Sequence, residues 1–329
     1  MPQTWPTTLQ RYKHIATDRG LALISNISSI EGTEEQFGSD FVLRRATEDE
    51  AKDFSPLVKA SANELTHERN PWESKVATQT PGDIEQGRFV VEPLAISDHR
   101  YHVADFAGNG FELHDVLDAS VMSSGPALVS DLGLYFGPSE GFASSGQLTT
   151  FRDETAISDV DLPVLTRRDA DNIRNVLPKL KTFAPNSELR RALSDFNALR
   201  RISRTSKLRM LGLFIILESL VAHKPQRGDR TDAISRQVAR KMTLHQQRFE
   251  RPWDHKIVVN PSAPWDTFWM RMYDLRSATA HRETPNAKDD GLELLKSMST
   301  ARDLLVGATR SLLRRSLEDP ALVFDVREC

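Results

Sequence analysis

The chain has 329 residues, of which 39% are hydrophobic and 27% charged, and its formal net charge is −3 at pH 7. This composition is typical of a folded globular protein, excludes disordered and fibrous classes, and allows two domains. No apolar stretch reaches the roughly 18 residues of a membrane span, and the first residues do not resemble a secretory signal. Cys329 is the only cysteine, which excludes an internal disulfide and a cysteine-based zinc site. We therefore expect a cytoplasmic protein.

The two parts of the chain carry opposite charges. Residues 1–160 contain 12 basic and 25 acidic side chains, a net charge of −13, whereas residues 161–329 contain 31 and 21, a net charge of +10. Together they give the total of −3. A basic domain suits a polyanionic partner, so this asymmetry indicates two domains with different partners.

Residues 1–150 are predicted to form an acidic, mixed α/β domain. A helix is expected after Thr47, because Thr47 and Glu50 have the spacing of a capping box and apolar residues then recur at helical spacing. Glycines and prolines from Gly108 onward predict loops, and the polar residues 151–164 predict a linker. Short segments rich in Val, Ile, Phe and Tyr predict strands at residues 21–27, 41–45, 89–96, 101–106 and 127–136.

Residues 165–320 are predicted to form an all-α bundle, followed by a tail at residues 321–329. We expect the most apolar helix, at 205–223, to be the most buried one. Glu218 interrupts its apolar run, so this carboxylate lies either on an exposed edge or beside a base inside the bundle. The expected helices are residues 168–180, 187–199, 205–223, 229–247, 264–281 and 287–317.

Common motifs of nucleotide-binding proteins and hydrolases are missing from the sequence. There is no Walker loop, dinucleotide fingerprint, Gly-x-Ser-x-Gly elbow or paired-histidine zinc helix. His99 and His102 lie beside Asp98 and Asp105 in a pattern that resembles a metal cluster. At strand spacing, however, the two histidines point to opposite faces, and we interpret them as surface residues of a turn.

Arg276 and His281 stand near the end of the predicted helix 264–281, with small residues between them. Five positions of an ideal helix correspond to about 140° of rotation, so the two side chains do not share one stripe. The long guanidinium can still swing toward the imidazole. Arg240 and His245 have the same separation, so spacing alone does not select a site.

The residues around Arg276 provide the selection. Residues 272–281 contain Tyr-x-x-Arg-Ser-x-x-x-His and closely resemble the signature of HEPN domains, in particular of the ApeA-like group. The apolar helix that carries Glu218, with the charged turn after it, resembles an earlier part of the same domain. The resemblance covers about residues 165–317. Where many members of the group have a glycine after the histidine, this chain has Arg282.

The resemblance implies a metal-independent endoribonuclease that needs no cofactor and acts as a homodimer, with the two Arg-His motifs facing each other. RNA supplies the nucleophile, its 2'-hydroxyl. His281 would transfer the proton, and Arg276 would stabilise the charge on the phosphate. Ser277 would bind phosphate or hold Arg276, and Glu218 would pair with Arg276. The expected products are a 2',3'-cyclic phosphate and a 5'-hydroxyl.

Further basic residues are candidates for RNA binding. At helical spacing residues 200, 204 and 207 share a face that would follow an RNA backbone. The aromatic residues Trp265, Phe268, Trp269 and Tyr273 recur at positions three and four apart, which predicts core packing rather than stacking on bases. The candidates for RNA binding are Arg200, Arg201, Arg204, Lys207 and Arg282.

The family context implies a toxin-like or antiphage defence effector that cleaves transfer or messenger RNA. An antitoxin or a trigger would act on the N-terminal domain, and we hypothesise that this acidic domain senses the trigger or shields the basic one. The alternative is a catalytically inactive HEPN protein that serves as an RNA-binding or regulatory dimerisation module. Only the ribonuclease requires Arg276 and His281 for an activity.

Overall fold

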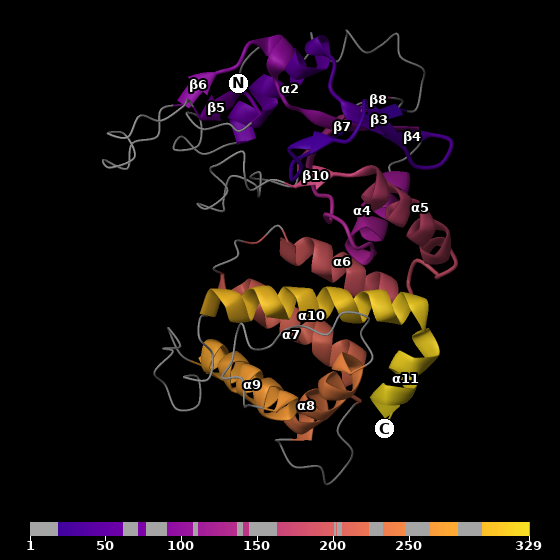
Figure 1. Ribbon diagram of the computed structural model, residues 1–329, viewed down its shortest axis with the longest axis vertical. Helices are drawn as coiled ribbons and strands as arrows, with labels where there is room; N and C mark the ends of the chain where they lie inside the picture. The colour runs from indigo at the N-terminus through magenta and orange to yellow at the C-terminus, as the bar shows by residue number, and fades with distance from the viewer. Residues whose placement is uncertain are drawn as a thin grey trace. The chain divides into compact units, whose positions relative to one another are not determined.

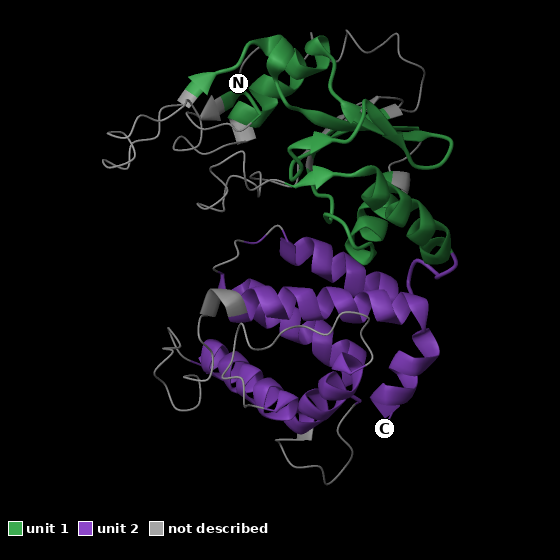
Figure 2. Cartoon of the chain, viewed as in Figure 1, with its two compact units in different colours: residues 1–181 green, residues 182–329 purple. Residues whose placement is uncertain are grey.

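The protein is described from a computed structural model. Two compact units make up the chain, residues 1–181 and residues 182–329 (Figure 2). The structure describes residues 19–61, 72–76, 91–107, 111–136, 141–144, 163–200, 202, 206–223, 233–247, 264–281 and 298–328.

The first unit contains a six-stranded antiparallel sheet with the order β3-β4-β7-β1-β8-β9 (Figure 1). Two smaller sheets accompany it. In one, β2 (Ser29–Ile30) pairs in parallel with β10 (Val164–Leu165), and in the other β5 (Ser74–Val76) pairs with β6 (Val91–Pro93). The large sheet consists of β1 (Arg19–Ile24), β3 (Glu34–Gln36), β4 (Phe41–Arg45), β7 (His102–Ala107), β8 (Ser130–Phe136) and β9 (Gly141–Ser144).

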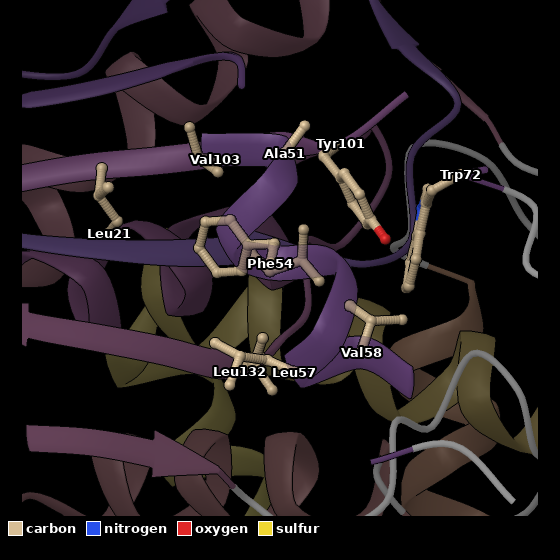
Figure 3. Close-up of a cluster of buried hydrophobic side chains, with 10 residues drawn as sticks. Leu21, Ala51, Phe54, Leu57, Val58, Trp72, Tyr101, Val103 and Leu132 are labelled. Carbon is tan, nitrogen blue, oxygen red and sulfur yellow. The ribbon is translucent and has the colours of Figure 1, made fainter. Parts of the chain in front are cut away.

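Helix α2 (Glu48–Ser61) covers one face of this sheet. Its first turn forms the predicted capping box, because the Thr47 amide donates to Oε2 of Glu50 at 2.8 Å and the Glu50 amide donates to Oγ1 of Thr47 at 3.3 Å. Figure 3 shows the hydrophobic cluster beneath the helix, in which Phe54 of α2 lies near strand side chains. The alternation of strand side chains places Leu21, Val103 and Leu132 in this cluster.

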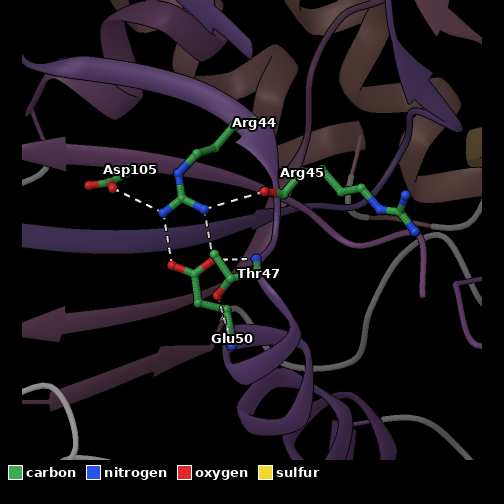
Figure 4. Close-up of polar contacts among 5 residues, drawn as sticks. All are labelled: Arg44, Arg45, Thr47, Glu50 and Asp105. Atoms are coloured by element: carbon green, nitrogen blue, oxygen red, sulfur yellow. Dashed lines mark hydrogen bonds and ion pairs between the residues drawn. The ribbon is translucent and has the colours of Figure 1, made fainter. Parts of the chain in front are cut away.

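A half-buried arginine joins the same face of the sheet to the start of α2 (Figure 4). Arg44 donates from Nη1 and Nη2 to the two carboxylate oxygens of Glu50, at 2.7 and 2.8 Å, and from Nη2 to Asp105 at 3.1 Å. Burial raises the pKa of the Glu50 carboxyl, but the hydrogen bonds from Arg44 and Thr47 outweigh burial and hold that pKa below its usual value.

The other face of the sheet carries α4 (Phe111–Met122), which contacts β7 and α5 (Arg167–Lys181). On this face the rings of Phe41 and Phe106 stack with centroids 6.3 Å apart. Gly20 is the cross-strand partner of Phe106, and a Cβ at Gly20 would lie 2.4 Å from that ring. Only glycine allows β1 and the aromatic ring to approach so closely.

The second unit is helical, and α7 is its central helix. The buried residues of α7 include Leu213, Phe214 and Leu217, which confirms the predicted burial of this segment. Ser206 caps the helix by accepting a hydrogen bond from the Leu208 amide at 3.2 Å. Helix α7 (Lys207–Val221) packs against α6 (Glu188–Arg200), α8 (Ala233–Gln246), α9 (Trp265–His281), α10 (Met298–Glu318) and α11 (Pro320–Glu328).

The expected order, a mixed N-terminal part followed by helices, is confirmed, but the boundary between the units differs from the expected one. We expected the helical domain to begin at residue 165, whereas the first unit extends to Lys181. The reason is that β10 pairs with β2, and α5 packs against α4. Residues 151–162 of the expected linker lie outside the described residues.

Three local expectations are wrong as well. The tail expected at 321–329 is helix α11, which contacts α7 and has Val323 and Val326 buried. Helix α4 was not expected, although the loop that follows it at residues 124–126 was, and within 89–96 the described strand is β6 alone. Among the described helices, none has the length and apolar character required to cross a membrane.

Candidate active site

The candidate site lies where α9 packs against α7 in the second unit. Nε of Arg276 on α9 is 3.2 Å from Oε1 of Glu218 on α7, which confirms the expected pairing. The side chains are 30% and 20% exposed, but the two facing atoms are themselves buried. Solvent ions therefore screen this attraction less than they would a pair of fully exposed charges.

Tyr273 completes the surroundings of the guanidinium. The guanidinium carbon of Arg276 lies 5.2 Å from the centroid of the Tyr273 ring, and that ring meets Phe214 of α7 edge-on at 6.3 Å. Burial and the negative charge of Glu218 raise the pKa of the Tyr273 hydroxyl, so it stays protonated at neutral pH. We expected Tyr273 to pack in the core, although its position three residues before Arg276 places the two side chains on the same side of the helix.

Ser277 and His281 occupy the exposed side of the same helix. Both side chains are exposed, and His281 is the last residue of α9. Within the described residues there is no hydrogen bond or ion pair between Arg276 and His281. One chain therefore presents a held guanidinium and, further along the helix, an imidazole that is accessible to a ligand.

The second Arg–His pair with the same spacing, Arg240 and His245, differs in the accessibility of its histidine. Arg240 on α8 is exposed, but His245 is only 1% exposed. A buried imidazole cannot reach a polymer substrate without local unfolding. Accessibility therefore separates His281 from His245, which spacing did not.

The candidate RNA-binding residues do not form the expected surface. Helix α6 ends at Arg200 and α7 begins at Lys207, so a single helical face through positions 200, 204 and 207 is wrong. Arg200 donates to Oδ1 of Asn197 at 3.2 Å. Ser206 was the sequence signal for the break, because serine is a preferred helix N-cap. Arg201, Arg204 and Arg282 lie outside the described residues.

The aromatic residues of α9 mainly serve the core, as expected. Phe268 and Trp269 are fully buried, and their ring centroids are 5.3 Å apart. Trp265 meets Phe268 edge-on at 5.6 Å. Phe268 and Trp269 are therefore not available to stack on bases.

Of the two histidines considered for a metal cluster, His102 differs from the expectation. His102 is only 4% exposed in β7, so it is a core residue and not a surface one. Burial and the nearby charge of Arg45 lower the pKa of His102 to about 4. His99 follows the short helix η2 (Ile96–Asp98). The described side chains contain no group of three or more His, Cys, Asp or Glu residues arranged to hold a metal.

No family model matches the chain, and neither does any curated protein or solved structure compared with it.

Proposed function

We propose that this protein is a metal-independent endoribonuclease of the HEPN type, which cleaves RNA by attack of the ribose 2'-hydroxyl on the adjacent phosphate. The observation that supports this best is the Glu218–Arg276 ion pair beside the exposed end of α9. The pair fixes a cation close to an accessible hydroxyl, Ser277, and an accessible imidazole, His281.

Each of these residues has a role in the reaction. His281 accepts the proton of the 2'-hydroxyl as the bond from the 2'-oxygen to phosphorus forms. The bond from phosphorus to the 5'-oxygen then breaks, and this leaving oxygen takes up a proton. Arg276 binds the phosphate oxygens, whose negative charge grows in the transition state. Glu218 and Tyr273 hold the guanidinium, and Ser277 donates a hydrogen bond to phosphate.

The second proton transfer requires a second acid. His281 of the partner subunit supplies it in a homodimer in which the two copies of α9 face one RNA strand. After proton transfer from the 2'-hydroxyl, one imidazole is charged and the other, having protonated the 5'-oxygen, is neutral. The products are a 2',3'-cyclic phosphate and a 5'-hydroxyl.

The charge of the helical unit supports an RNA substrate. Residues 182–329 contain 26 basic and 18 acidic side chains, a net charge of +8, whereas residues 1–181 have 17 and 28, a net charge of −11. A basic unit attracts the phosphates of RNA and releases their counterions on binding. A toxin-like or antiphage defence role, with transfer or messenger RNA as the target, follows as part of the same proposal.

The test is cleavage of total cellular RNA by the purified full chain in the presence of EDTA, with the cut ends mapped. We expect wild-type protein to leave 2',3'-cyclic phosphates, and His281→Ala and Arg276→Ala to lose this activity. Arg271→Ala is the matched control, because Arg271 lies on the same helix and pairs with Asp274 at 3.0 Å on its exposed side. It should cleave like the wild type.

Two outcomes would contradict the proposal. Equal cleavage by all four proteins would indicate a contaminating nuclease or a different site. RNA binding and dimerisation without any cleavage, unchanged in His281→Ala, would support the alternative, a non-catalytic RNA-binding or regulatory module.

A further inference from the structure

A polar cavity of about 410 Å³ lies in the first unit, which contains none of the residues of the proposed ribonuclease site. It opens between the loop after β1, the end of β4, η2 and the start of β7. We call it the arginine pocket. Its polar lining includes Ser28, Ser29, Thr33, Arg45, Arg100 and His102.

Arg45 and His102 reach the arginine pocket from neighbouring strands. They are cross-strand partners in β4 and β7, so their side chains lie on the same face of the sheet. In Figure 4 the side chain of Arg45 extends away from the neighbouring network of Arg44. This face is opposite to the one on which Arg44 binds Glu50 and Asp105.

The guanidinium of Arg45 is held in place by main-chain oxygens. Nη2 donates to the carbonyls of Ser97 and His99 at 3.1 and 2.9 Å, and Nε donates to that of His99 at 3.2 Å. Among the described residues Nη1 has no hydrogen-bond acceptor. Carbonyls fix the orientation of the cation without neutralising its charge, so it remains able to bind an anion.

His102 adds a buried and neutral nitrogen base. The side chain is 4% exposed, and its Nδ1 is buried without a well-oriented hydrogen-bond partner among the described residues, although an interaction of the ring with the main chain of Arg100 partly favours its protonated form. A buried polar atom without a partner is costly, and a ligand that supplies one removes that cost. Burial and the charge of Arg45 keep the pKa of His102 at about 4, so the imidazole is neutral at pH 7.

The chemistry of the described lining selects for a phosphate group. Two guanidiniums and three hydroxyls donate hydrogen bonds, and guanidiniums bind phosphate oxygens in pairs. Asp98 is the only carboxylate among the described lining residues, so the charge of this lining is positive. The volume lies within the roughly 300–1,000 Å³ of small-molecule sites and exceeds what a free phosphate fills. Asp98 can accept a hydrogen bond from a sugar hydroxyl or a base amino group.

We propose that the arginine pocket binds a phosphorylated small molecule of the size of a nucleoside monophosphate. The phosphate lies against Arg45 and Arg100, beside His102, and the remainder of the ligand extends toward Asp98. The inference is independent of RNA cleavage, because all residues that carry it belong to the first unit.

The test is calorimetric titration of the full chain with four nucleoside monophosphates, inorganic phosphate and adenosine as separate probes. We expect at least one monophosphate to bind with one site per chain, phosphate to bind more weakly, and adenosine not to bind. Arg45→Gln and Arg100→Gln should weaken binding at least about tenfold, since each removes a charged donor. Arg168→Gln is the control, because Arg168 is an exposed arginine of the same unit outside the pocket.

Absence of saturable binding by every phosphate probe would overturn the proposal, as would equal weakening by Arg168→Gln and Arg100→Gln. Arg45→Gln also removes the contacts to Ser97 and His99 and could unfold the loop that it anchors. A measurement on the wild-type protein tests the pocket without this structural change. The NMR signals of the His102 ring nitrogens can be assigned by their loss in His102→Gln. In the wild-type protein these signals should shift when the monophosphate that binds in the calorimetric titration is added. Unchanged signals at saturation would place the ligand elsewhere and overturn the proposal.

Discussion

Nε of Arg276 on α9 lies 3.2 Å from Oε1 of Glu218 on α7, and both side chains remain partly open to solvent. Ion pairs with this exposure contribute about 0–1 kcal/mol to stability. The contact is therefore worth more for the direction it gives the guanidinium than for the stability of the bundle. Breaking the contact should therefore affect catalysis more than stability, and the two effects can be measured separately.

Glu218→Gln should leave the fold intact and reduce RNA cleavage. We expect the free energy of unfolding in urea to change by less than about 1 kcal/mol. The turnover number should fall by about tenfold to a hundredfold, because small displacements of a catalytic group have effects of this size. The Michaelis constant should change little, and Glu218→Asp should recover part of the rate. Asp274→Asn, which breaks the Arg271 pair on the same helix, is the control and should be neutral. An unchanged turnover number in Glu218→Gln would show that Glu218 does not position Arg276 for catalysis.

Arg44→Met should destabilise the first unit by on the order of 3 kcal/mol, because it leaves the carboxylate of Glu50, only 8% exposed, without its guanidinium. Lys52→Met is the control, since Lys52 pairs with Glu48 and Asp49 on the exposed side of α2, and it should leave stability unchanged. Urea unfolding measures both.

The effect of Arg44→Met should also depend on pH. The pKa of Glu50 is lowered in the folded protein, so the stability it contributes is present above its unfolded pKa and is lost as pH falls through the folded value. The difference between wild type and Arg44→Met should therefore shrink in acid. A difference that is constant from neutral to acidic pH would contradict the role given to Glu50.

His102 should make the first unit sensitive to mild acid. Its pKa is about 4 in the folded protein, whereas the ordinary pKa of a histidine is about 6.5, so below pH 6.5 the unfolded chain binds a proton that the folded chain does not. The stability from this histidine is complete above pH 6.5 and falls as pH decreases, and the loss amounts to on the order of 3 kcal/mol by pH 4. His102→Gln should flatten the pH dependence of unfolding between pH 7 and 4. Equal slopes for the two proteins would show that His102 is not buried in the neutral form.

Two helical glycines should respond in opposite ways to alanine. At Gly307 on α10 a new Cβ meets no atom within 4 Å, so Gly307→Ala should raise the free energy of unfolding by about 0.5–1 kcal/mol. At Gly212 on α7 the new Cβ would lie 2.4 Å from Cδ2 of Leu199 on α6. Gly212→Ala should therefore lower it by about 1–3 kcal/mol. Thermal unfolding would rank the two variants, and stabilisation by Gly212→Ala would mean that α6 and α7 can separate at little cost.

Local patterns in the sequence predicted much of the structure. The capping box of Thr47 and Glu50, the buried helix around Phe214 and the strand at residues 41–45 all depend on neighbours in sequence, and all are confirmed. The contact of Glu218 with Arg276 was expected from the resemblance together with the cost of a carboxylate in an apolar run. The sequence thus indicated the two partners, and the structure supplied the distance between them.

The wrong predictions concern where an element packs. The helical structure of α5 was predicted correctly. The apolar pattern of its buried residues, such as Ile173 and Leu177, does not indicate which unit they pack against. Helix α4 was missed because glycines on both sides of it indicated loops, although Leu113, Val116 and Leu117 repeat at helical spacing. His102 was placed on the surface because burial of a single polar residue depends on distant strands.

The pairing of β10 with β2 has a practical consequence for separating the two units. A single backbone cut between β9 and β10 would not release the N-terminal piece, because β10 and α5 would keep their contacts with β2 and α4. Conversely, a fragment started at residue 165 would expose the apolar side of α5 to water and would tend to aggregate. Dissection of this chain should therefore place the junction between Lys181 and Thr182.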